Sequence, residues 1–99
     1  MNSKNTKDLQ KYGPITGVAL LFDNGNYYVS MEAPARHLDL MMNQIKEGVD
    51  PVKVENAEKG FVTQNGYFFR RSVARHYALR TEQIKEAKHP RLLFSDDLW

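Results

Sequence analysis

The chain has 99 residues, of which 41% are hydrophobic and 26% charged, with no cysteine and a net charge of +2. This length allows one domain with one hydrophobic core, and the lack of cysteine excludes disulfides and thiolate metal sites. The longest apolar run, residues 18–22, is far shorter than the roughly 18 residues of a membrane helix. The polar start of the chain has no signal-peptide core, so we expect a cytoplasmic protein.

Polar residues fill positions 1–13, which we expect to form a flexible segment. A single α+β domain is predicted over residues 14–99. Its first unit, about residues 15–48, begins with an apolar run, the pair Asn24-Gly25 and a Tyr-Tyr-Val run. Asn-Gly between such runs is a strong β-hairpin signal, because both residues tolerate a positive φ.

A helix is predicted after this hairpin, from near Pro34 to Gly48. Proline is favoured in a first helical turn because its missing N–H has no partner there, and glycine is a common C-cap. Four apolar residues recur at helical spacing on one face of this segment: Leu38, Met41, Met42 and Ile45. The polar stretch over residues 50–59 is expected to be a linker.

The second unit, about residues 60–88, repeats this order. Two β-type runs, residues 61–63 and 67–69, flank a second Asn-Gly pair. Ser72 is a good N-cap for a helix that ends before His89-Pro90. The second half of the chain therefore predicts a hairpin followed by a helix, as the first half does.

The two predicted helices also resemble each other. Residues 35–47 (ARHLDLMMNQIKE) and 74–86 (ARHYALRTEQIKE) agree at Ala-Arg-His, at one leucine and through Gln-Ile-Lys-Glu. This repetition predicts duplicated ββα units, with an antiparallel sheet and two main helices; chance similarity between amphipathic helices is the alternative. The apolar tail, residues 89–99, is expected to dock on its own core or on a partner. A small core and an apolar tail favour a homo-oligomer.

Positive charge gathers in the second half of the chain. Residues 1–50 carry a net charge of −1 and residues 51–99 a net charge of +3. Between Arg70 and Arg80 lie four arginines and no acid. A solvated helix face is the commoner explanation of such a run, but the guanidinium group also matches phosphate oxygens in shape and charge.

Arg36-His37 and Arg75-His76 are predicted near the two helix starts. With Ala33 or Ser72 as the cap, both arginines take the third helical position and both histidines the fourth. A cation at a helix N-terminus costs about 0.3–1 kcal/mol, and a bound anion would reverse the sign of that penalty. Ion pairs with Asp39 or with the C-terminal acids are the alternative.

The hairpin strands hold adjacent aromatic residues, Tyr27-Tyr28 and Phe68-Phe69, so that each strand has an aromatic side chain on both faces. Core packing is the default role, but an exposed ring beside arginine can stack on a base. No nucleophile, phosphate-loop or metalloprotease motif is present. A catalytic pair of His37 and His76 would need both side chains in one cleft.

The chain resembles a family of small phage proteins, the anti-Thoeris nucleotide sponges, over about residues 17–99. The resemblance rests on Gly60-Phe61-Val62, Gly66-Tyr67-Phe68, Arg71, Ala74, Gln83, the closing LFSDDLW and, upstream, Ala35-Arg36-His37. It implies a phage-encoded protein in the host cytoplasm that is not an enzyme and uses no cofactor or metal. Such a protein sequesters a cyclic ADP-ribose-type signal or a cyclic oligonucleotide at the subunit interfaces of a dimer or larger even-numbered oligomer.

The resemblance also implies roles for single residues. Arg36 would hold phosphate, Phe61 would stack on adenine, and Arg91 would close on the diphosphate. Arg70 stands where an Asn or Asp is expected, which implies altered base recognition. The candidate ligand-binding residues are therefore Arg36, His37, Phe61, Arg70, Arg71, Arg75, His76 and Arg91.

Three alternatives stay open at this point. The first is a small nucleic-acid-binding module that uses the arginines of residues 70–80, and it predicts steep salt dependence. The second is a two-histidine phosphodiesterase, and the third is an interaction protein whose tail binds a host factor. We favour the nucleotide over nucleic acid as the partner, and no membrane contact is expected.

Overall fold

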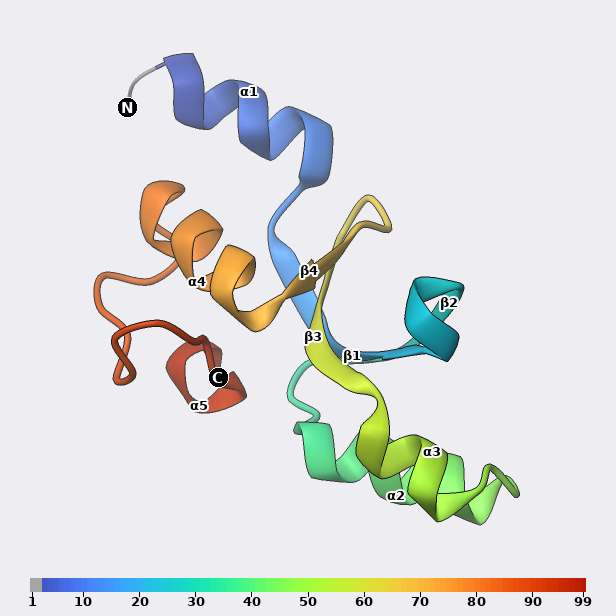
Figure 1. The fold of residues 1–99 in the computed structure, drawn as a ribbon. Coiled ribbons are helices and arrows are strands. Elements are labelled where there is room, and N and C mark those ends of the chain that lie inside the picture. Colours follow the sequence, from blue (N-terminus) through green and yellow to red (C-terminus); the bar gives the residue numbers. More distant parts are fainter. Residues whose placement is uncertain (1–2) are drawn as a thin grey trace.

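The computed structural model describes residues 3–99, with the side chains of residues 7–23 and 25–99. Its elements, shown in Figure 1, are α1 (Ser3–Tyr12), β1 (Ile15–Phe22), the 3-10 turn η1 (Asp23–Gly25), β2 (Tyr27–Glu32), α2 (His37–Lys46), α3 (Pro51–Asn56), β3 (Glu58–Thr63), β4 (Phe68–Arg70), α4 (Arg71–Arg80) and α5 (Ser95–Leu98). This is a small α+β fold, as predicted. No helix in the described part of the chain is long and apolar enough to cross a membrane.

The four strands form one antiparallel sheet in the order β2-β1-β3-β4. Both hairpins lie where the Asn-Gly pairs predict them, and Gly25 and Gly66 have φ values of 95° and 87°. Gly60 of β3 lies opposite Arg70 of β4. A Cβ atom at position 60 would lie 2.5 Å from the carbonyl oxygen of Phe69, so this glycine lets β4 approach β3 and fixes where Arg70 stands.

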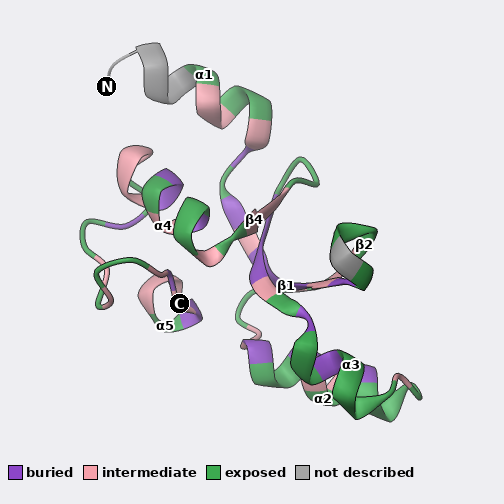
Figure 2. Ribbon diagram, viewed as in Figure 1, coloured by how far each residue is buried: buried purple, intermediate pink, exposed green. Residues whose placement is uncertain are grey.

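The core lies where the helices pack against β1 and β3. Its largest fully buried side chains come from the central strands, two helices and the tail: Val18, Leu20, Leu40, Val54, Phe61 and Leu93. Figure 2 shows the buried positions concentrated along β1 and β3, whereas most of α2 and α3 is exposed. Because these residues come from both predicted ββα units and from the tail, neither unit encloses a core of its own.

Both main helices differ from their predicted bounds. α2 begins at His37, after an N-cap at Arg36 whose backbone N–H donates to Asp39 Oδ2 at 2.8 Å. α4 begins directly after β4 with Arg70 as its N-cap, so the predicted cap at Ser72 is wrong. The expected start near Pro34 is also wrong, because residues 33–36 form the turn and loop that follow β2.

α4 ends at Arg80, and its predicted continuation to about residue 88 is wrong. Beyond it, Gln83 accepts a hydrogen bond from Ile15 N at 2.9 Å and donates to Ile15 O at 2.8 Å. This pair binds the chain to the start of β1 through one side-chain amide. The helical periodicity of residues 81–88 is therefore overridden by a tertiary contact.

The predicted linker contains a helix instead. Asp50 caps α3 by accepting from Val52 N at 2.9 Å, and Pro51 occupies the first helical position. Val54 of this short helix is completely buried. The segment over residues 50–59 is thus part of the domain, and its last two residues, Glu58 and Lys59, begin β3.

Helix α1 takes the place of the flexible segment expected over residues 1–13, of which residues 1–2 lie outside the described chain. Tyr77 Oη donates to Gly13 O at 2.6 Å. Arg80 Nε lies 3.2 Å from Asp8 Oδ2, and the Tyr12 ring packs edge-on against Tyr77. These contacts attach α1 to α4.

The tail folds back onto the domain. Leu93 is fully buried, and its backbone N–H donates to Arg71 O at 3.1 Å. Trp99 Nε1 donates to Ala35 O at 2.9 Å, which joins the end of the chain to the loop before α2. The tail thereby spans the gap between the start of α4 and the start of α2 (Figure 1).

Candidate functional site

The two predicted Arg-His pairs lie in different settings. Arg36 caps α2, and its Nη1 lies 3.0 Å from Asp96 Oδ1 and 3.2 Å from Ser95 Oγ. Arg75 lies inside α4, and its Nε donates to His89 O at 2.9 Å. The prediction of matching anion ligands at two helix starts is therefore wrong, because α4 begins four residues before Arg75. Both arginines hold the tail.

His37 and Phe61 belong to the interior. His37 is buried, its Nε2 lies 2.7 Å from Gly60 O, and its ring packs edge-on against Phe61. Burial lowers the pKa of His37; the hydrogen bond with Gly60 O partly offsets this effect, and Arg71 and Lys59 lower the pKa further. Phe61 has no exposed surface, so its predicted role as a platform for a base is corrected to a core side chain.

His76 is exposed on α4, whereas His37 is buried beside β3. Neither histidine lines the basic pocket or the α3 pocket described below. Arg91 is exposed in the loop before the tail helix, where its backbone N–H donates to His89 Nδ1 at 3.0 Å. None of these three residues meets another candidate residue in a pocket.

Arg70 and Arg71 do come together, with a third cation that the sequence did not single out. They share a pocket of about 250 Å³, here called the basic pocket, which is lined by Glu58, Lys59, Arg70, Arg71, Ser72 and Leu92. Three of these side chains are cationic and one is anionic. The net positive charge favours an anionic ligand.

Arg71 is the most constrained of the three cations. Its guanidinium carbon lies 4.8 Å from the centre of the Phe94 ring, a cation–π contact that orients the group. Its Nε is buried and has no hydrogen-bond partner among the described residues. Burial lowers the pKa of Arg71 from its usual range, but an arginine stays charged at neutral pH. A buried, unpaired N–H of a charged group is costly, so the Arg71 guanidinium keeps a donor that lacks an acceptor in the described chain.

The start of α4 adds to this positive field. Within the described chain no side chain caps α4, and its first turn contains no acid. The first N–H groups of a helix have no partner within the helix, and together they carry about half a positive charge. Arg71 and Ser72 are the first two residues of α4 and also line the basic pocket. Backbone and side chains therefore favour the same kind of ligand.

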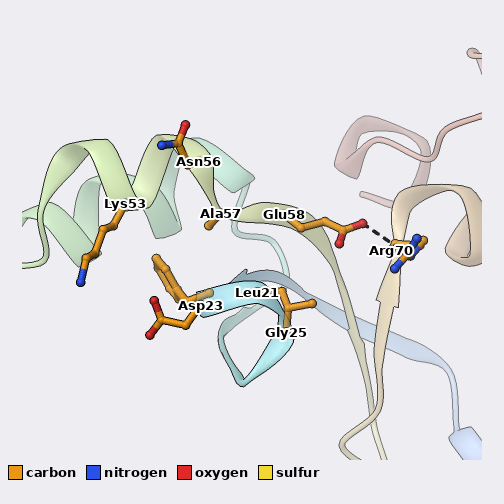
Figure 3. A pocket seen from close by; sticks show the side chains of 9 residues that line it. Leu21, Asp23, Gly25, Lys53, Asn56, Ala57, Glu58 and Arg70 are labelled. Carbon is orange, nitrogen blue, oxygen red and sulfur yellow. Dashed lines mark ion pairs between the residues drawn. The ribbon is translucent and has the colours of Figure 1, made fainter.

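A larger pocket of about 470 Å³ adjoins the basic pocket; we call it the α3 pocket. Its lining comes from β1, η1, α3 and the start of β3, with Arg70 from β4: Leu21, Phe22, Asp23, Gly25, Lys53, Asn56, Ala57, Glu58 and Arg70. Figure 3 shows Glu58 pointing toward Arg70, with Asp23 and Lys53 at the opposite end. Glu58 Oε2 lies 3.5 Å from Arg70 Nε, and both residues line both pockets.

Sequence reasoning named two residues of this site, Arg70 and Arg71, because they lie in a run rich in arginine. It missed Lys59 and Asn56, which were assigned to a linker, and it took Phe94 only as part of an apolar tail. The lining residues come from segments that are far apart in the sequence. Only the capping pattern Asp-Pro at residues 50–51 could have indicated that the supposed linker was structured.

The comparisons with known proteins give one result. No curated protein and no solved structure matches the chain. Residues 14–99 match the family model described as phage T4 y16D protein. This confirms the coarser expectation of a phage protein family, while the link to nucleotide sponges still rests on resemblance alone. The chain belongs to the phage T4 y16D protein family.

Proposed function

We propose that this protein binds and sequesters a small phosphorylated nucleotide, of the cyclic type that the resemblance implies, without cleaving it. One observation carries the proposal: Lys59, Arg70 and Arg71 line one pocket at the start of α4, and the Nε atom of Arg71 is buried without a partner among the described residues. Phosphate oxygens would accept hydrogen bonds from these donors, and such charge-assisted bonds are stronger than neutral ones.

The α3 pocket supports a nucleoside as the rest of the ligand. Its volume of about 470 Å³ lies in the range typical of small-molecule sites, about 300–1,000 Å³, whereas the basic pocket alone is smaller. Asn56 has an amide that can donate and accept, and Phe22 contributes an aromatic side chain to the lining. A ligand that spans the Glu58–Arg70 pair would place phosphate in the basic pocket and the base in the α3 pocket.

The arrangement also supports binding without turnover. A general acid or base must lie within hydrogen-bond reach of the reacting atoms, and neither pocket is lined by a histidine among the described residues. His37 is occupied by Gly60 O. These observations support binding over the two-histidine phosphodiesterase, which would need His37 and His76 in one cleft.

The contacts of Arg75 and Arg80 weigh against the nucleic-acid alternative, which would use all four arginines of residues 70–80 as one surface. Arg75 is bonded to the backbone of His89, and Arg80 is paired with Asp8. Of the four arginines in residues 70–80, Arg70 and Arg71 line the basic pocket. Binding along a nucleic-acid backbone would instead require a row of free cations and would weaken steeply with salt.

The experiment is calorimetry with cyclic ADP-ribose and with cyclic oligonucleotides, followed by mass spectrometry of ligand released by heat. Arg71→Gln should weaken binding by about 10- to 100-fold, since a hydrogen bond to a charged group contributes about 1.5–3 kcal/mol. Lys85→Gln, which removes an exposed charge outside both pockets, is the matched control and should bind normally. Equal affinities for the two variants, or release of cleaved ligand, would refute the proposal.

A further inference from the structure

We infer that the outer face of α2 is the surface on which a second copy of this chain docks, in an antiparallel arrangement about a two-fold axis. Leu38, Met42 and Ile45 on this face are 66%, 59% and 38% exposed. Their spacing of four and three residues places them in one stripe along the helix. The stripe lies opposite Leu40, which is buried in the core, so this apolar face is not needed for folding.

A hollow accompanies the stripe. A pocket of about 580 Å³ is lined by Met31 of β2 and by Asp39, Met42, Asn43, Ile45 and Lys46 of α2. Met31 belongs to an edge strand of the sheet, so the hollow opens at the border of the domain. Contiguous exposed apolar surface beside a concave site is typical of an interaction surface.

The charges along α2 favour a second copy of this chain as the partner on this surface. Asp39 stands near the N-terminal end of α2 and Lys46 at its C-terminal end, and their spacing of seven residues puts both on one side of the stripe. A two-fold axis brings the same patch of both subunits together. Two antiparallel α2 helices then place Asp39 of each copy against Lys46 of the other, so the patch complements itself in charge.

The same symmetry accounts for the hollow. When Asp39 is opposite Lys46 of the second copy, Met42 lies near the axis and Leu38 lies beside the far end of the opposing helix. Ile45 and Lys46 form that end and line the hollow. Leu38, the most exposed of the three stripe residues, then lies beside the part of the hollow that Ile45 and Lys46 of the second copy line. Burial of this stripe would supply most of the affinity, because exposed ion pairs contribute little.

Sedimentation velocity over micromolar to millimolar concentrations tests the inference. The wild-type protein should form a dimer, and Met42→Glu should raise the dimer Kd by about 30-fold or more, as expected for a residue at the centre of an interface. Val73→Glu is the matched control, because Val73 is an apolar residue of α4 that is 47% exposed and outside this pocket. Circular dichroism establishes that both variants are folded.

A second variant tests the geometry. Lys46→Glu should also weaken the dimer, because each copy then sets a carboxylate at position 46 against Asp39 of the other, and adding salt should reduce this difference. A wild-type protein that sediments at about 11.5 kDa throughout would overturn the inference. So would a dimer that Met42→Glu leaves intact, since that result would place the interface elsewhere. Neither outcome bears on nucleotide binding, whose pockets share no residue with this surface.

Discussion

Phe61 is the largest fully buried side chain of the core. Replacing a buried Phe by Ala costs about 3–5 kcal/mol of folding stability. We therefore expect Phe61→Ala to lower Tm strongly, and to lose nucleotide affinity only where the variant is unfolded. Chemical denaturation together with calorimetry on the folded fraction would measure both quantities. A normal Tm with a much weaker affinity would instead restore Phe61 as a base platform.

We expect the stability of the fold to depend on pH through His37. Burial, with Arg71 and Lys59 nearby, lowers the pKa of His37 in the folded protein, whereas an unfolded histidine titrates near its usual value of about 6.5. Below that pH the unfolded state binds more protons, so the free energy of unfolding should fall as the pH drops from about 6.5 through the lowered pKa of the folded state.

The matched variant for this prediction is His37→Gln, whose amide can still donate to Gly60 O. Tm measured between about pH 7.5 and pH 5 should fall more steeply for the wild type than for the variant, because only the wild type carries the buried imidazole. His76 and His89 are present in both proteins, so the comparison isolates the side chain at position 37. Parallel curves for the two proteins would show that His37 contributes no such dependence.

At the scale of elements, the tail builds part of the candidate site. Leu93 anchors it in the core, Leu92 lines the basic pocket, and Phe94 lies against the Arg71 guanidinium. The chain after α4 is thus the structural support of the pocket. Its sequence, which is apolar with an acidic insert, serves both the core and the cap of α5.

Leu93→Ala should therefore affect stability and binding together. Truncating a buried leucine costs about 2–5 kcal/mol, and a loosened tail should release Trp99, the only tryptophan of the chain, from its hydrogen bond to Ala35. Fluorescence emission of Trp99 should shift to the red in the native buffer, and nucleotide affinity should drop in parallel. If the emission shifts while affinity stays at the wild-type level, the tail does not shape the pocket.

Local patterns predicted some elements and missed others for identifiable reasons. The two hairpins were predictable because the glycine of each Asn-Gly pair takes the positive φ that the turn needs. The end of α4 was not, because Gln83 reaches Ile15 across the fold. Likewise α1 has a polar sequence, and its position depends on contacts of Tyr77 and Arg80 from the other end of the chain.

On the scale of the whole molecule, the candidate site forms where segments that are far apart in the sequence meet in the fold. The arginines could be named from the sequence, since they are adjacent at residues 70–71. Lys59 enters through the pairing of β3 with β4, and Leu92 enters through the docked tail. Periodicity and composition carry no information about such long-range neighbours. The apparent match of Arg36 with Arg75 failed because β4 runs directly into α4, which places Arg75 four residues inside that helix, whereas Arg36 is the N-cap of α2.

The most direct measurement follows the Nε–H signal of Arg71 by ¹⁵N NMR as cyclic ADP-ribose or a cyclic oligonucleotide is added. Arg71→Gln assigns the signal by its loss. Because this N–H is buried without a described partner, a phosphate acceptor should move its resonance downfield and slow its exchange with water. We expect the shift to saturate with the calorimetric Kd. Ligand binding that leaves the Arg71 resonance in place would contradict the proposed site.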